Sequence, residues 1–178
     1  WEDLEELEQN AQKVYDGIEK DSFAELMNGE ITTRNVLTQL LRLSQITGGF
    51  VRIDDGDDTQ QLSTAKLDAL EDVIDSCMEE GKKVIVFARF VPEIEAISRM
   101  LRKKNIGCAL IKGDVKDRAE QVSAFQTDPD TKVFVGQLQT TGMGLTLTAG
   151  SVCVYYSLDF SYANYQQSMA RVRRIGQT

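Results

Sequence analysis

Apolar residues in the first third of the chain recur every three or four positions, which is the spacing of one helix face. The first run is made of Leu4, Leu7, Ala11, Val14 and Ile18. A second run covers residues 37–46, and the pair Gly48-Gly49 behind it favours a helix end, because glycine adopts positive φ at little cost. A third run over residues 67–77 predicts another helix that ends near Gly81.

From residue 84 onward, short continuous apolar runs alternate with stretches of helical spacing. The runs at 84–87, 108–111, 133–135 and 152–156 predict strands. Helical spacing follows the first two runs, and Pro92 suits the first turn of the earlier helix. Strands that are apolar throughout are expected where helices cover both faces of a sheet. The pattern therefore predicts an α/β fold with a parallel sheet and right-handed crossovers.

The composition is that of an ordinary globular domain, with 42% hydrophobic and 27% charged residues in 178. No apolar window approaches the roughly 18 residues that a membrane-spanning helix needs, so we expect no membrane partner. The chain contains no histidine, which excludes histidine-based catalysis. Cys77, Cys108 and Cys153 lie far apart within apolar runs, and we expect reduced core residues rather than metal ligands. Because the chain begins at Trp1, we expect a piece of a longer protein.

Charge divides the chain into two parts. The net charge is -8, but residues 1–80 carry 20 acidic and 6 basic side chains, whereas residues 81–178 carry 8 acidic and 14 basic ones. The second part is therefore suited to a partner rich in phosphate. The stretch 54–58 predicts an exposed acidic loop, and it lacks the glutamate that closes a calcium-binding loop. We predict a helical segment over 1–52, an acidic loop over 53–61 and an α/β unit over 62–178.

The end of the chain carries the strongest candidate chemistry. On a helix, Gln167, Arg171 and Arg174 share one face, while Arg173 points elsewhere. Paired guanidinium groups suit a phosphate whose charge spreads in a transition state. The alternative is a solvated basic helix end that offsets the helix dipole. A second candidate is the glycine loop 140–144, whose amides can approach phosphate closely, although a plain turn has the same composition.

In this order, the segments resemble the second lobe of the Swi/Snf branch of helicase superfamily two, over essentially the whole chain. The pattern QxxxRxxRIGQ at 167–177 resembles the sixth motif of that family, and its RIGQ ending separates it from DEAD-box relatives. The stretch 141–149 resembles the fifth motif, and VIVFARF at 84–90 resembles the fourth. Residues 31–50 resemble the helical segment that precedes this lobe in the family.

Smaller matches and departures complete the resemblance. Lys112-Gly113-Asp114 with Arg118 resembles the segment between the fourth and fifth motifs, and Asp159-Phe160 takes the place of the usual Asp-Trp pair. The departures are Arg89 for a frequent glutamine, Thr146 for asparagine and Arg173 for histidine. Short connections favour a bacterial or phage member. We expect a cytoplasmic protein in that case, or a nuclear one if the source is eukaryotic.

The resemblance implies a three-layer RecA-like fold of the P-loop NTPase type, in which helices flank a parallel sheet, with an N-terminal helical segment that joins two motor lobes. It implies ATP and Mg²⁺ in the complete two-lobe protein. The implied partners are the first RecA-like lobe of the same protein, the backbone of double-stranded DNA and a nucleoprotein substrate. No GxxxxGK[ST] loop occurs in the sequence, so we expect this chain to be inactive by itself and to bind nucleotide weakly.

The resemblance also assigns roles to individual residues. The implied catalytic residues are the arginine fingers Arg171 and Arg174, and the implied nucleotide cleft is lined by Gln167, Gly142, Met143 and Gly144. The residues that we expect to contact DNA are Arg89, Lys112, Gly113, Arg118, Thr140 and Thr141. Asp159 is expected to have a structural or coupling role within the lobe.

Two other classes of function remain open. One is a non-catalytic protein-interaction module on an α/β scaffold, which the arginine spacing disfavours. The other is a Rossmann-like cofactor enzyme, which the sequence after the first strand disfavours because Phe87 to Pro92 contains no glycine fingerprint.

Overall fold

The computed structural model describes residues 9, 11–20, 33–52, 59–113, 116–137, 139 and 145–172, of which 33–35, 52, 171 and 172 are described by their backbone alone. The chain divides into two compact units, Trp1–Ala69 and Leu70–Thr178. None of the helices in the described ranges has both the length and the apolar character needed to cross a membrane.

The first unit contains two helical stretches and a small hairpin. Residues 11–20 are helical, and α2 spans Thr33–Thr47. The predicted glycine stop after α2 is confirmed, because Gly48 N–H donates to the Ser44 carbonyl at 3.2 Å and Gly49 has a φ of 87°. Strands β1 (Phe50–Arg52) and β2 (Thr59–Gln61) then pair antiparallel.

The hairpin corrects two predictions. We predicted a helical segment up to residue 52 and a loop up to residue 61, but both stretches end in strands. The side chains of Thr59, Gln60 and Gln61 are all exposed, so β2 has no apolar alternation from which a strand could be predicted. The acidic residues 54–58 and the apolar positions Leu4 and Leu7 lie outside the described residues.

The second unit is built around a parallel sheet. Helix α3 spans Ala65–Glu79 and ends as predicted near Gly81, which has a φ of 68°. The elements that follow are β3 (Val84–Ala88), α4 (Val91–Lys103), β4 (Gly107–Ile111), α5 (Arg118–Thr127), β5 (Thr131–Gln137), β6 (Val152–Tyr155) and α6 (Tyr162–Val172). The four strands pair in the order β4-β5-β3-β6, and all three pairings are parallel. The predicted sheet is therefore confirmed.

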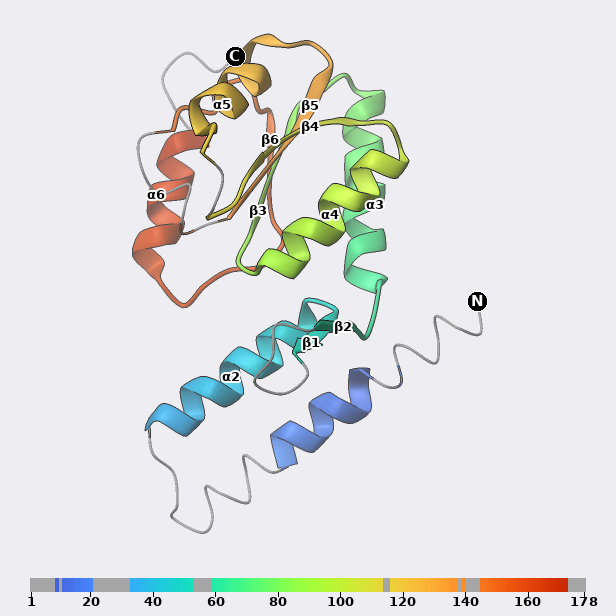
Figure 1. The fold of residues 1–178 in the computed structure, drawn as a ribbon, viewed down its shortest axis with the longest axis vertical. Coiled ribbons are helices and arrows are strands. Elements are labelled where there is room, and N and C mark those ends of the chain that lie inside the picture. Colours follow the sequence, from blue (N-terminus) through green and yellow to red (C-terminus); the bar gives the residue numbers. More distant parts are fainter. Residues whose placement is uncertain are drawn as a thin grey trace. The chain divides into compact units, whose positions relative to one another are not determined.

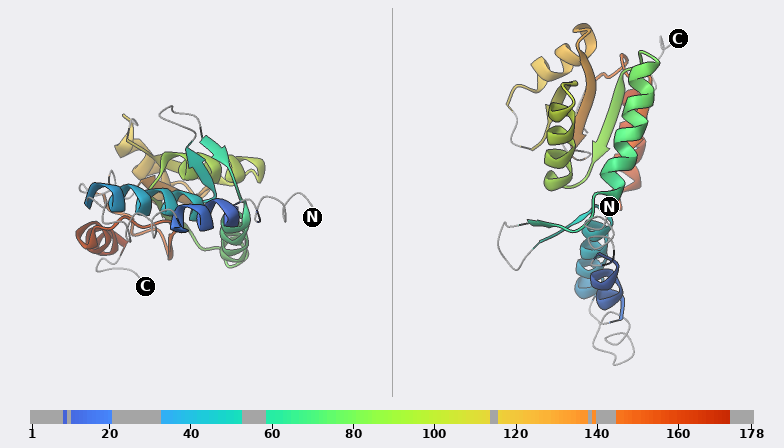
Figure 2. Two further views of the ribbon diagram at one scale, coloured as in Figure 1. Left: turned by 90° about the horizontal axis from the view of Figure 1, so that it is seen from below. Right: turned by 90° about the vertical axis from the view of Figure 1, so that its right-hand side faces the viewer.

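Helices cover both faces of this sheet. Figure 1 shows α5 and α6 on one side and α3 and α4 on the other, and the right-hand view of Figure 2 shows α3 and α4 in front of the sheet. Helices α3 and α4 are joined by Lys104, whose Nζ lies 2.7 Å from Glu71 Oε1 and 2.6 Å from Asp75 Oδ2. The three-layer α/β class is confirmed.

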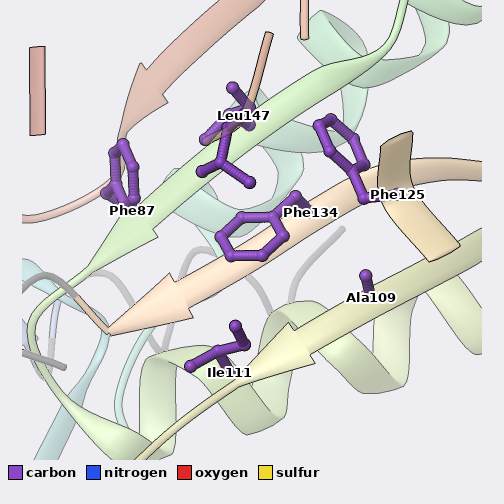
Figure 3. Packing of buried hydrophobic residues seen from close by; sticks show 7 residues of the cluster. Phe87, Ala109, Ile111, Phe125, Phe134 and Leu147 are labelled. Carbon is purple, nitrogen blue, oxygen red and sulfur yellow. The ribbon is translucent and has the colours of Figure 1, made fainter. Parts of the chain in front are cut away.

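The core on the α5 side is a cluster of fully buried apolar side chains, drawn in Figure 3. Its members are Ile85, Phe87, Ala109, Ile111, Phe125, Phe134 and Leu147. The rings of Phe125 and Phe134 lie 5.6 Å apart. Strand β3 is buried along its whole length, as expected for a central strand with both faces covered. This packing fixes the carboxyl ends of the strands relative to one another.

Candidate functional site

The carboxyl ends of the four parallel strands meet at one edge of the sheet, where ligands of such sheets usually bind. Arg89 follows β3, the pair Lys112-Gly113 follows β4, and Ser157 lies just beyond β6. The candidate residues behind β5, which are Thr140, Thr141, Gly142, Met143 and Gly144, lie outside the described residues. At this strand the site can therefore be described only as far as Gln137, the last residue of β5.

Arg89 is fixed through its backbone to both neighbouring strands. Its N–H donates to Oγ of Ser157, two residues after the end of β6, at 2.7 Å. Its carbonyl accepts a hydrogen bond of 3.2 Å from Gln137 Nε2, at the end of β5. The side chains of Gln137 in β5 and of Ser157 just after β6 thus hold Arg89, the residue that follows the central strand β3.

A buried carboxylate supports this arrangement. Glu93 is only 2% exposed, and its Oε2 accepts hydrogen bonds from the Ser157 hydroxyl and, at 3.1 Å, from the Phe90 N–H. The second bond is that of a helix-capping glutamate in the first turn of α4. Glu93 and Gln137 were not among our predicted site residues. The Pro-Glu pair at 92–93 was a usable signal for the first, whereas nothing in the sequence marked the second.

The Arg89 guanidinium lies over two aromatic rings. Its Cζ is 5.0 Å from the centroid of Phe90 and 5.0 Å from the centroid of Phe160. Within the described ranges its buried Nη1 has no hydrogen-bond partner. Phe160 is 63% exposed, so its ring is largely outside the core.

The cations near β4 are engaged with protein groups. Lys112 Nζ lies 3.2 Å from Glu95 Oε1 of α4, which offsets part of its charge. Arg118 begins α5, and its Nη2 donates to the Gly113 carbonyl at 3.3 Å. Lys112, Gly113 and Arg118 therefore lie together at the same edge as Arg89, as predicted, although their DNA contacts stay a prediction.

Helix α6 carries Gln167 and Arg171 four residues apart, which places both on one helix face. Gln167 is exposed, while the side chain of Arg171 and all of Arg173 and Arg174 lie outside the described residues. The helix is held on the sheet by Tyr155 of β6, whose hydroxyl lies 2.7 Å from Ser168 Oγ. The rings of Tyr155 and Tyr165 lie 5.1 Å apart.

The start of α6 is fixed by two hydrogen-bonding side chains. Ser161 Oγ accepts from Asn164 N–H at 3.3 Å, which is the bond of a helix N-cap. Asp159 accepts from Ser161 N–H at 3.0 Å and from Asn164 Nδ2 at 2.5 Å. The position of Asp159 at this junction is compatible with the coupling role that we predicted, which stays a prediction.

The three cysteines are free thiols. Burial raises the pKa of Cys108 to about 12 and that of Cys153 to about 11, and it is also the main cause of the raised pKa of Cys77. Such thiols are poor nucleophiles at neutral pH. In the part of the chain that the structure describes, no three acidic or cysteine side chains are grouped to hold a metal.

Comparison with known proteins gives this edge its context. The model of the family "Helicase conserved C-terminal domain" matches residues 65–176. An uncharacterized ATP-dependent helicase of Mycoplasma genitalium is 28% identical over 176 residues, which are 97% of this chain and 17% of that protein. The human DNA excision repair protein ERCC-6-like is 32% identical over 124 residues, which are 68% of this chain and 10% of that protein.

Solved structures show the same fold. The Sulfolobus solfataricus SWI2/SNF2 ATPase core in complex with dsDNA has a TM-score of 0.73 at 24% identity, covering 96% of this chain and 36% of the other. A second structure, described as the Sulfolobus solfataricus SWI2/SNF2 ATPase core domain, has a TM-score of 0.75 at 21% identity, covering 92% of this chain and 35% of the other. This chain thus spans a small part of the relatives that it matches. It belongs to the family of helicase conserved C-terminal domains, and the solved structures that share its fold are described as SWI2/SNF2 ATPases.

Proposed function

We propose that this chain is the second motor lobe of a Swi/Snf-like DNA-dependent ATPase that moves on duplex DNA. The observation that carries the proposal is the family match over residues 65–176, which includes nearly all of the arginine-rich segment. The solved relative that holds double-stranded DNA supports the choice of duplex as the substrate.

In this proposal, Arg171 and Arg174 act as arginine fingers on ATP that the first lobe binds. Planar guanidinium groups neutralise the charge that spreads over the γ-phosphoryl oxygens as the bond to the β-phosphate breaks. The anchoring of α6 to β6 through Tyr155 and Ser168 supports this role, because a finger must be held at a defined position. Gln167, Gly142, Met143 and Gly144 would line the nucleotide cleft.

In this proposal the chain supplies only half of an ATP site. The sequence contains no GxxxxGK[ST] loop, and the described residues offer no acidic cluster for Mg²⁺. We therefore assign the phosphate loop and the magnesium ligands to the first lobe, and we expect the isolated chain to hydrolyse no ATP.

The DNA-facing residues of the proposal are Arg89, Lys112, Gly113, Arg118, Thr140 and Thr141. The excess of basic side chains after residue 80 supports contacts to phosphates, which need no base recognition. The compartment depends on the source of the protein. We expect a cytoplasmic protein for a bacterial or phage member and a nuclear protein for a eukaryotic one.

The test is DNA-stimulated ATP hydrolysis by the full-length protein, with duplex and single-stranded DNA compared. Arg174→Ala should lower the stimulated turnover by about a hundredfold or more, given what arginine fingers contribute. Arg171→Lys and Arg174→Lys, which keep the charge but lose the planar fork, should also be impaired. Unchanged turnover in all of these variants would instead support a non-catalytic interaction module.

A further inference from the structure

Arg89 differs from the other cations of the carboxyl edge in how it is held. Both hydrogen-bonding atoms of its main chain are bound by side chains, the N–H by Ser157 and the carbonyl by Gln137. Ser157 is itself bound to the buried Glu93. The backbone that carries the guanidinium is therefore tied to three neighbouring elements, β5, β6 and α4.

The side chain is held as well, by the faces of two rings. Phe90 adjoins Arg89 in sequence, whereas Phe160 comes from the segment between β6 and α6. An aromatic face attracts a guanidinium through its π electrons and leaves the N–H donors in the guanidinium plane for other acceptors. The ring of Phe160 is 63% exposed and yet lies against Arg89, so its position is not explained by burial in the core.

The hydrogen-bonding capacity of this guanidinium is not used within the described part of the chain. There, Arg89 forms no ion pair, and its buried Nη1 has no acceptor. The Arg89 side chain as a whole is only partly buried, so a ligand oxygen would bind to the guanidinium N–H donors other than Nη1. Lys112 at the same edge contrasts with it, because its ammonium is already paired with Glu95.

We propose that Phe160 is a positioning residue that holds the Arg89 guanidinium ready for a phosphate oxygen of the DNA backbone. The inference rests on the proposed function and deepens it. The ring restricts the guanidinium before DNA arrives, so less side-chain freedom is lost on binding. Phe160 acts through Arg89 and makes no contribution of its own to the DNA contact.

The test is a double-mutant cycle in the full-length protein. The affinity for a fluorescein-labelled duplex is measured by anisotropy over a range of salt concentrations for wild type, Arg89→Ala, Phe160→Ala and the double variant. We expect Phe160→Ala to weaken binding about twofold to fivefold, which is the contribution of one exposed cation–π contact. In the Arg89→Ala background, Phe160→Ala should leave the DNA affinity unchanged. Arg89→Ala should also reduce the slope of log K against log salt by about 0.9, as expected for one lost phosphate contact.

Three further variants sharpen the cycle. Phe160→Trp keeps a strong cation–π face and should retain wild-type affinity, whereas Phe160→Leu keeps apolar bulk without a ring and should match Phe160→Ala. The matched control is Tyr162→Ala, because Tyr162 is 70% exposed and its ring partner is Tyr165. Affinity should be unchanged in this control.

Several results would overturn the inference. The first is a loss of DNA affinity from Phe160→Ala that is equally large in the presence and in the absence of Arg89. The second is an unchanged DNA affinity in Phe160→Ala or Phe160→Leu. The third is a raised KM for ATP in Arg89→Ala together with an unchanged DNA affinity. The Arg174→Ala turnover is measured in parallel. If Arg174→Ala abolishes turnover while Phe160→Ala leaves DNA affinity intact, the motor assignment stands and the positioning role fails. If turnover survives Arg174→Ala, the proposed function itself fails.

Discussion

Ser157 is the side chain whose removal should disturb the carboxyl edge most directly. Its hydroxyl donates to the buried Glu93 carboxylate and accepts the Arg89 N–H at 2.7 Å. Ser157→Ala removes both hydrogen bonds at once and introduces no bulk. It also leaves the Arg89 N–H and one lone pair of Glu93 without these partners in a partly buried place.

The size of the effect follows from the two bonds. A hydrogen bond to a charged group contributes about 1.5–3 kcal/mol, and one between neutral groups contributes about 1 kcal/mol. We therefore expect Ser157→Ala to lower the free energy of unfolding by about 2–4 kcal/mol, since both terms apply. For a chain of this length the melting temperature should fall by roughly 5–15 °C.

Urea unfolding of the 178-residue chain, followed by circular dichroism, measures this change, and amide hydrogen exchange gives a local readout at Arg89. The Arg89 amide should exchange faster in Ser157→Ala. The matched control is Ser151→Ala, because Ser151 is exposed at the other end of β6, and its stability should change by less than about 0.5 kcal/mol. Equal stability of the two variants, with the Arg89 amide still protected, would refute the reasoning.

Further predictions concern the scaffold. In Gly107→Ala the new methyl group would meet the backbone oxygen of Asp130, so we expect a loss of stability of more than about 2 kcal/mol by urea unfolding, and a stability equal to wild type would contradict it. Ser161→Ala removes the N-cap of α6 and should cost about 1 kcal/mol, with reduced helicity by circular dichroism. Because burial raises the pKa of Cys153 to about 11 and of Cys108 to about 12, the unfolded chain, with thiols near 9.0, ionises first. Stability should therefore be retained below about pH 9 and fall as the pH rises toward 11, a fall that alanine at both positions should reduce.

Most of the fold of the second unit was predictable because its signals are local. Each of its strands contains a continuous apolar run, and the ends of α2 and α3 are marked by glycines with positive φ. The hairpin of the first unit was missed because all three residues of Thr59–Gln61 are polar and exposed. No local apolar pattern indicates that this segment pairs with Phe50–Arg52.

The site was predictable in part for the same reason. Arg89 follows an obvious strand, so its place at the carboxyl edge could be inferred from sequence. Its partners could not, because Gln137, Ser157 and Phe160 reach it only once the order β5-β3-β6 is known. The sheet order is a long-range property that no short window of sequence carries.

The central position of β3 has a consequence for how the chain folds during synthesis. Val84 of β3 pairs with Val152 of β6, so one side of the central strand stays open until almost the whole unit has been made. During that interval an apolar strand presents free backbone donors and acceptors, which is the kind of edge that joins other chains. A ribosome that stalls before β6 would therefore release an aggregation-prone intermediate, and truncations that end before residue 150 should be insoluble.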